Sequence, residues 1–233
     1  MLFSLLNSGN DMRVIITQIA FTLIIVLISL SVHEYAHGYA AYKLGDNTAY
    51  NFGRLTLNPL KHIDFLGMLC MLLFGFGWAK PVPINSRNFK KTRRDIAIVS
   101  VAGPVSNLVL AIIGIILLNV VKVLFVRNYI SLNEYEMMLY SNASIFFYLF
   151  SYMNISLAVF NFLPIPPLDG SRLITVILPK KMALLSFKYE RYVQIALFVL
   201  LYLGAFTNII STCVDAIFNG ISYLVTLIPI FRI

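Results

Sequence analysis

Two histidines and a glutamate lie within five residues of one another, in the sequence His33-Glu34-Tyr35-Ala36-His37. Histidines four residues apart on a helix project from the same face, so one ring nitrogen of each could bind a single metal ion. Glu34 could instead take a proton from a water on that ion, the division of roles typical of metal-dependent hydrolases with this spacing. The pattern therefore predicts a metal site and hydrolytic chemistry.

The residues before this motif indicate that it lies in or near a lipid bilayer. Residues 14–32 carry no charge and are mostly Ile, Leu, Val and Phe, over a length sufficient for a membrane-spanning helix. An ionisable side chain at that depth costs about 2.5–3.5 kcal/mol or more unless it is paired or binds an ion. Metal binding would explain the cluster; the alternative is a packed pair of neutral histidines beside a stray glutamate.

The composition of the 233-residue chain is that of a polytopic membrane protein. Hydrophobic residues make up 59% of it and charged residues 12%, with a mean hydropathy of +0.83. The net charge of +8 fits basic flanks on the cytoplasmic side of membrane segments, and we expect no nucleic-acid partner. Cys70 and Cys213 lie in apolar stretches without paired spacing, so neither a disulfide framework nor a cysteine metal site is expected.

Apolar runs along the chain predict an all-α fold with about five transmembrane helices. The expected spans are residues 12–44, 96–126, 144–163, 192–206 and 209–231. Gly45, followed by two polar residues, is expected to end the first of them. Residues 63–78 form a short apolar run broken by glycines, which predicts a re-entrant segment or a sixth membrane segment. Alternating residues at 51–57 predict a short strand, a small β element.

The charges of the loops predict which side of the membrane the motif faces. Residues 80–94 and 172–191 are rich in Lys and Arg, so the positive-inside rule places both in the cytoplasm. The connection at 127–142 contains Glu134 and Glu136 and is expected on the outer face. The motif would then lie toward the cytoplasmic side of a multi-pass protein of the plasma membrane.

A catalytic zinc ion usually takes three protein ligands and keeps a fourth position for water, so a third residue is needed. The candidates at membrane depth are His62, Asp64, Asp169 and Asp215. Asp169 is best placed, because the prolines at 164–167 interrupt the preceding helix and Gly170 lets the backbone turn. Its alternative is a surface aspartate at a helix end, and His62 and Asp64 are second choices.

Three motifs follow one another in the chain. They are the sequence 33–37, Gly103-Pro104-x-x-Asn107, and Asn161-x-x-Pro164-x-Pro166-x-x-Asp169-Gly170. Together they resemble the site-2 protease family of intramembrane zinc metalloproteases, and residues 53–59 and 77–83 resemble its small prokaryotic branch without a PDZ or CBS domain. The resemblance covers the chain from the first helix to Gly170 and implies one integral-membrane metalloprotease domain over residues 1–233.

The resemblance also implies roles for the site residues. His33, His37 and Asp169 would hold one catalytic zinc ion, and Glu34 would be the general base. Asn161 would bind the substrate backbone or the developing oxyanion, and Asn107 would help to shape the site. Hydrogen bonding between helices is the alternative for both asparagines.

The expected substrate is a transmembrane helix of another membrane protein, cut in or next to the bilayer. Such a helix must unwind first, and residues 51–57 or 63–78 could then pair with it by strand addition. The competing class is non-catalytic: a metal transporter or an inactive protease-like chaperone. Glu34 argues against both, since neither needs a general base. Besides the substrate and the bilayer, a homo-oligomer stays open as a partner.

Overall fold

The computed structural model describes residues 11–74, 77–129 and 132–231, which fold into helices joined by turns. The long helices are α2 (Met12–Lys43), α5 (Thr92–Asn128), α6 (Glu134–Asn161), α8 (Lys180–Tyr202) and α9 (Thr207–Thr226). The short helices are α3 (Thr48–Asn51), α4 (Phe65–Phe74) and α7 (Asp169–Ile177), with 3-10 turns η1 (Pro59–Lys61), η2 (Ser86–Asn88) and η4 (Pro229–Phe231).

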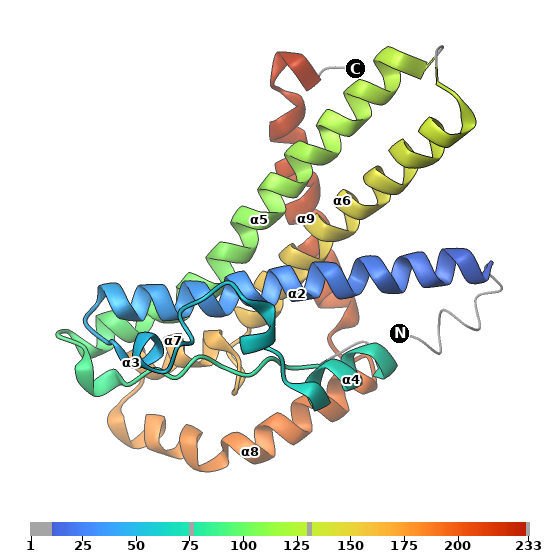
Figure 1. Ribbon diagram of the computed structural model, residues 1–233. Helices are drawn as coiled ribbons and strands as arrows, with labels where there is room; N and C mark the ends of the chain where they lie inside the picture. The colour runs from blue at the N-terminus through green and yellow to red at the C-terminus, as the bar shows by residue number, and fades with distance from the viewer. Residues whose placement is uncertain (1–10, 75–76, 130–131, 232–233) are drawn as a thin grey trace.

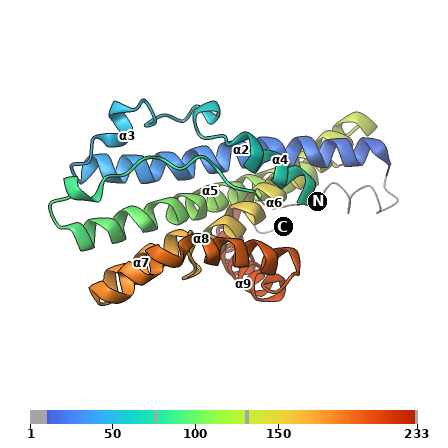
Figure 2. The same ribbon diagram turned by 90° about the horizontal axis from the view of Figure 1, so that it is seen from below.

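The antiparallel pair of α5 and α6 forms the centre of the fold. Figure 1 shows α9 running beside this pair, while α2 crosses it and α8 lies across one end. Seen from below, α2 lies on one side of α5 and α7 on the other (Figure 2). The core between α5, α6 and α9 consists of Ala111, Ile115, Ile155, Val214 and Val225. Two elements that flank α5 therefore carry the candidate ligands, α2 the histidines and α7 the aspartate.

Four helices, α2, α5, α6 and α9, are long and apolar enough to cross a membrane. The prediction of an all-α membrane protein is confirmed to this extent, with four candidate spans in place of the expected five. The expected span at 192–206 begins in the second half of α8, which ends at Tyr202 and also contains Lys188, Glu190 and Arg191. Because one continuous helix includes these charges, α8 is not among the candidate spans of the described residues.

The first helix ends where the sequence predicts. Leu44 caps α2, and Gly45 follows with a φ of 104°, a left-handed conformation that glycine adopts without strain. The carboxylate of Asp46 then accepts hydrogen bonds from Thr48 and from the backbone N–H of Asn85, the latter at 2.7 Å. The turn after α2 is thereby tied to the segment around η2.

The segment 63–78, described apart from residues 75–76, contains one short helix, since α4 covers only Phe65–Phe74. Ile63, at the start of the segment, forms an isolated antiparallel bridge with Ala79, directly after its end. The backbone N–H of Lys80 also donates to the carbonyl of His62 at 2.8 Å. Since the two ends of the segment lie side by side, its geometry favours a re-entrant segment over a span.

The strand predicted for residues 51–57 is wrong. Asn51 ends α3, and Gly53 follows with a φ of 63°. The backbone N–H of Arg54 donates to the carbonyl of Ala49 at 2.9 Å, and the side chain of Asn58 caps η1. Turn-forming Asn and Gly residues thus outweigh the alternating pattern, and within the described ranges the only β pairing is the bridge between Ile63 and Ala79.

Candidate metal centre

Three buried side chains converge between α2 and α7. The Nε2 atoms of His33 and His37 are 3.0 Å apart, and Asp169 Oδ2 lies 3.2 Å and 3.1 Å from them, respectively. Each of these residues is at most 9% exposed. Among the described residues, this is the one group of His, Cys and acidic side chains compact enough to hold a metal ion. His62 and Asp64 lie outside it.

The break between α6 and α7 brings Asp169 to the histidines. Residues 162–168 form turns and bends, as the prolines predict, and Asp169 is the first residue of α7. Gly170 is needed for this approach, because a Cβ there would collide with the carbonyl oxygens of Phe162 and Leu163. A short helix that follows a tight break therefore directs the carboxylate toward α2.

A hydrogen bond at Nδ1, the ring nitrogen outside the ligand cluster, orients each histidine. His37 Nδ1 lies 2.7 Å from the carbonyl oxygen of Val99, and His33 Nδ1 lies 2.6 Å from Asn107 Oδ1. Both of these oxygens can only accept, so each Nδ1 carries the proton and donates it. Each Nε2 then has no proton, and its lone pair faces the other ligands.

A relay of buried amides determines the orientation of Asn107. Asn154 Nδ2 donates to the carbonyl of Phe150 at 2.8 Å, which leaves Asn154 Oδ1 as the acceptor. Asn107 Nδ2 donates to that oxygen at 2.9 Å, which in turn directs Asn107 Oδ1 toward His33. Both asparagines are 0% exposed. A backbone carbonyl of α6 thereby fixes the tautomer of a candidate metal ligand on α2.

The three ligand atoms fit a zinc ion. Two lone pairs and a carboxylate at 3.0–3.2 Å repel one another unless a cation lies among them. In tetrahedral zinc sites, ligand atoms lie about 3.3 Å apart.

Gly103 of α5 lies directly against these ligands. A Cβ at this position would collide with the Nε2 atoms of both His33 and His37. The glycine of the second motif thus leaves room at the nitrogens that face the candidate ion.

Glu34 lies beside the three ligands but has a different partner. Its Oε2 accepts a hydrogen bond from the backbone N–H of Val82 at 2.8 Å. A hydrogen bond holds the segment before Val82 in place: Arg54 Nη2 donates to the carbonyl of Lys80 at 2.7 Å. The candidate base therefore contacts an extended, anchored segment between α4 and α5.

Asn161, at the C-terminus of α6, is half-buried and donates through Nδ2 to the carbonyl of Leu157 in its own helix at 2.9 Å. Its role toward substrate stays a prediction. Sequence reasoning missed Asn154, which lies seven residues before Asn161 and hence on the same face of α6. A polar side chain inside an apolar span is the signal that could have identified it. The backbone groups of Val82 and Val99 carry no such signal.

Residues 21–204 match the family model described as peptidase family M50. The chain is 42% identical over 184 residues to "Putative zinc metalloprotease YwhC" of Bacillus subtilis (strain 168), an alignment that covers 77% of this chain and 79% of that protein. It is also 32% identical over 149 residues to "Putative zinc metalloprotease Rip2" of Mycolicibacterium smegmatis, over 62% of this chain and about half (52%) of that relative's length. No solved structure matches the chain.

Proposed function

The chain belongs to peptidase family M50, the site-2 proteases, and we propose that this membrane zinc metalloprotease hydrolyses a peptide bond in or next to a transmembrane helix of a membrane-protein substrate. The observation that carries the proposal is the position of the His33, His37 and Asp169 cluster, which is buried among helices long and apolar enough to cross a bilayer. A substrate helix in the bilayer could reach such a site from within the membrane.

The cluster would hold one zinc ion through the Nε2 atoms of both histidines and the Asp169 carboxylate. Bound zinc would polarise the scissile carbonyl and make an attacking water more acidic. Glu34 would accept the proton from that water and later deliver it to the leaving amine. The hydrogen bond from Val82 N–H supports this role, because it holds the Glu34 side chain in place.

The two asparagines of the family motifs would act differently. Asn107 would keep His33 in the tautomer that offers Nε2 to the metal. Asn161 would bind the substrate backbone or the developing oxyanion once its amide leaves the carbonyl of Leu157. The active site would face the cytoplasmic side of the plasma membrane, as the basic residues at 80–94 and 172–191 favour.

The test is to measure zinc content and cleavage of a fluorescent transmembrane-helix substrate by detergent-purified protein, wild type beside Glu34→Gln. We expect about one zinc in both, with cleavage at least about 100-fold slower in the variant. Glu134→Gln, an exposed glutamate at the start of α6, is the matched control and should cut normally. Absence of zinc from the wild type, or normal cleavage by Glu34→Gln, would contradict the proposal. Bound zinc with no cleavage of any helix would favour metal transport, which a flux assay measures.

A further inference from the structure

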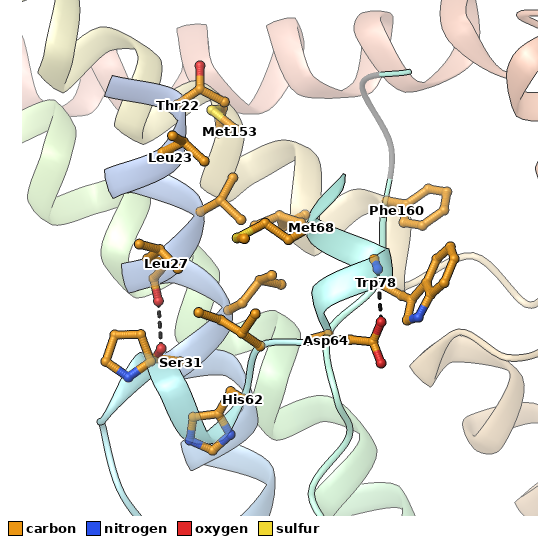
Figure 3. Close-up of a pocket in the computed structure, with 18 of the residues that line it drawn as sticks. Thr22, Leu23, Leu27, Ser31, His62, Asp64, Met68, Trp78, Met153 and Phe160 are labelled. Atoms are coloured by element: carbon orange, nitrogen blue, oxygen red, sulfur yellow. Dashed lines mark hydrogen bonds between the residues drawn. The ribbon is translucent and has the colours of Figure 1, made fainter. Parts of the chain in front are cut away.

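The segment 78–85 leads from a mostly apolar cavity to the candidate catalytic base. The cavity has a volume of about 350 Å³, and Figure 3 shows Trp78 and His62 in its wall. Four residues after Trp78, the backbone N–H of Val82 donates to Glu34 Oε2 at 2.8 Å. The contacts that fix this N–H group therefore also fix the position of the Glu34 carboxylate.

The sequence of this segment leaves a single backbone donor for Glu34. Pro81 and Pro83 have no N–H, so Val82 is the only one of these three residues that can donate. A residue before a proline is also restricted to extended conformations. The Val82 side chain is buried, and its Cγ1 would lie only 3.2 Å from a Cβ at Gly38, one turn after Glu34 on α2. The prolines and this packing bring the peptide group of Val82 against α2.

Arg54 binds the other end of the same peptide group. Its Nη2 donates to the carbonyl oxygen of Pro81 at 3.3 Å and to that of Lys80 at 2.7 Å. The carbonyl of Pro81 and the N–H of Val82 belong to one peptide bond, which is trans, so these two groups point in opposite directions. A guanidinium on the carbonyl side therefore turns the N–H toward Glu34.

The polar contacts of Arg54 are concentrated on these two carbonyls. Within the described ranges Arg54 forms no ion pair, although the residue is half-buried. Its Nε is buried and has no hydrogen-bond partner among the same residues. Burial of part of a guanidinium without a carboxylate costs free energy, and the hydrogen bonds to the segment 78–85 offset this cost.

We propose that Arg54 is a positioning residue for the general base. It directs the N–H of the Pro81–Val82 peptide bond toward the Glu34 carboxylate, which is thereby held in place for proton transfer. The two stretches that resemble the small prokaryotic branch, 53–59 and 77–83, meet in this contact. The inference rests on the proposed function, in which Glu34 is the base, and it adds a residue that acts on Glu34 without touching the substrate.

The first measurement follows the Val82 amide directly and needs no cleavage. Val82 and Val105 are the two valines that follow a proline, so protein labelled with 13C-carbonyl proline and 15N-valine gives two signals in an HNCO spectrum. Glu34→Gln should move the Val82 amide proton upfield, because a hydrogen bond to a carboxylate is shorter and stronger than one to an amide. In protein that carries Arg54→Gln, the same change at Glu34 should no longer move this proton. Val105 is the internal reference and should not move in any variant.

The second measurement is single-turnover and steady-state cleavage of the transmembrane-helix substrate. We expect Arg54→Gln to lower kcat about tenfold, with KM within about twofold and zinc content unchanged, because a displaced base slows proton transfer and not substrate binding. In the Glu34→Gln background, Arg54→Gln should have no further effect, since a residue that acts only through Glu34 then has nothing to position. Arg87→Gln removes an exposed arginine of η2 and is the matched control, which should leave kcat unchanged.

The inference is overturned if Glu34→Gln moves the Val82 proton equally with and without Arg54. It is also overturned if Arg54→Gln slows cleavage by the same factor in both backgrounds, as a general structural role would, or if it raises KM alone, as a substrate contact would. If Arg54→Gln does not fold, Arg54→Lys takes its place, because it keeps the charge and one donor to a carbonyl; its losses in both measurements should be smaller but in the same direction.

Failure of the proposed function gives a different result. Wild-type protein would then cut no helix, while the Val82 proton would still respond to Glu34→Gln only in the presence of Arg54. That outcome would leave Arg54 as the residue that positions Glu34 and remove the proposed protease. Normal cleavage by the wild type, with the same response of the Val82 proton in both backgrounds, would remove only the role of Arg54.

Discussion

The histidines of the metal centre and the histidine of the cavity differ in how their nitrogens are used. In His33 and His37 both ring nitrogens have partners within 3.2 Å: Nδ1 donates to an oxygen, and Nε2 faces the other ligands. In His62 Nε2 donates to Thr56, and Nδ1 has no partner in the described part of the chain. The metal centre is a preorganised site, whereas His62 has one ring nitrogen that is buried without a partner among the described residues.

In each of these two regions a glycine packs so closely against its neighbours that a Cβ would collide with them. Gly103 lies against the imidazole nitrogens, and Gly67 of α4 lies against the backbone of Trp78 in the cavity wall. If the regions are separable, adding a methyl group at each glycine should affect different measurements. The segment from Trp78 to Asn85 connects them, because it lines the cavity at one end and reaches Glu34 and then Asp46 at the other.

The largest effect is expected from Gly103→Ala. Its Cβ would collide with the Nε2 atoms of both histidines, which must then turn away from Asp169. We expect zinc affinity to fall by at least about 100-fold, and cleavage to be lost with the zinc. This loss exceeds the effect of removing a hydrogen-bond partner of a metal-bound histidine, which is about 10- to 100-fold. Chelator competition measures the affinity.

Gly220→Ala on α9 is the control for this variant. Its Cβ would meet nothing within 4 Å, and the residue lies outside the group of candidate ligands. It should therefore leave zinc affinity unchanged. Normal zinc affinity in Gly103→Ala would show that the histidines can adjust, and the description of a rigid centre would be wrong.

A smaller loss of zinc is expected from Asn107→Leu, which removes the acceptor for His33 Nδ1. Supporting partners of metal-bound histidines typically contribute about 10- to 100-fold in affinity. Asn107→Asp retains an acceptor but loses the donor to Asn154, so we expect it to bind zinc more tightly than the leucine variant. Asn119→Leu, at another buried asparagine of α5, is the control. Equal affinity in both Asn107 variants would contradict the relay.

The metal ligands could be predicted from the sequence because their positions follow from local rules. Helical spacing places His33 and His37 on one face, and the prolines before Asp169 prevent α6 from continuing. The partners of these residues could not be predicted in the same way. Val82 and Val99 act through backbone N–H and C=O groups, which every residue type offers, so only the folded chain identifies them.

The differences between the predicted and the observed fold have equally specific causes. Residues 51–57 alternate like a strand, but a strand needs a neighbour, and Gly53 turns the chain away from one. The apolar run 192–206 has a length close to that of a span, yet α8 continues through the charges at 188–191. Apolar length indicates that a helix is buried or in lipid, but it does not show where that helix begins.

Gly67→Ala tests the other side of the comparison. Its Cβ would collide with the backbone of Trp78, so α4 and the cavity wall must separate. We expect cleavage to slow about tenfold while zinc content stays the same, because the displaced segment leads to Val82 and no metal ligand lies on α4. Gly220→Ala, where a Cβ would meet nothing within 4 Å, is the control. Loss of zinc along with cleavage would show that the two regions are one unit.

The smallest effect is expected from Asp46→Asn, at the far end of the connecting segment. The Asp46 carboxylate is 0% exposed and accepts hydrogen bonds from Thr48, from Asn85 N–H at 2.7 Å and from Asn88 Nδ2 at 2.7 Å. Burial alone would raise its pKa, but these donors lower it below the ordinary value of 3.8. Replacement by a neutral amide should cost about 1.5–3 kcal/mol at pH 7, or about 4–10 °C in melting temperature, with zinc content unchanged.

The effect of Asp46→Asn should depend on pH with a definite sign. A carboxyl group whose pKa is lower in the folded protein stabilises the fold above its unfolded pKa, and this stabilisation is lost as the pH falls through the folded pKa. The melting temperatures of wild type and Asp46→Asn should therefore differ by a constant amount above about pH 4 and converge below it. Asp11→Asn, which keeps a residue suited to cap α2, should show no such convergence. A difference that persists unchanged below pH 4 would mean that packing, and not the charged hydrogen bonds of Asp46, holds this end of the segment.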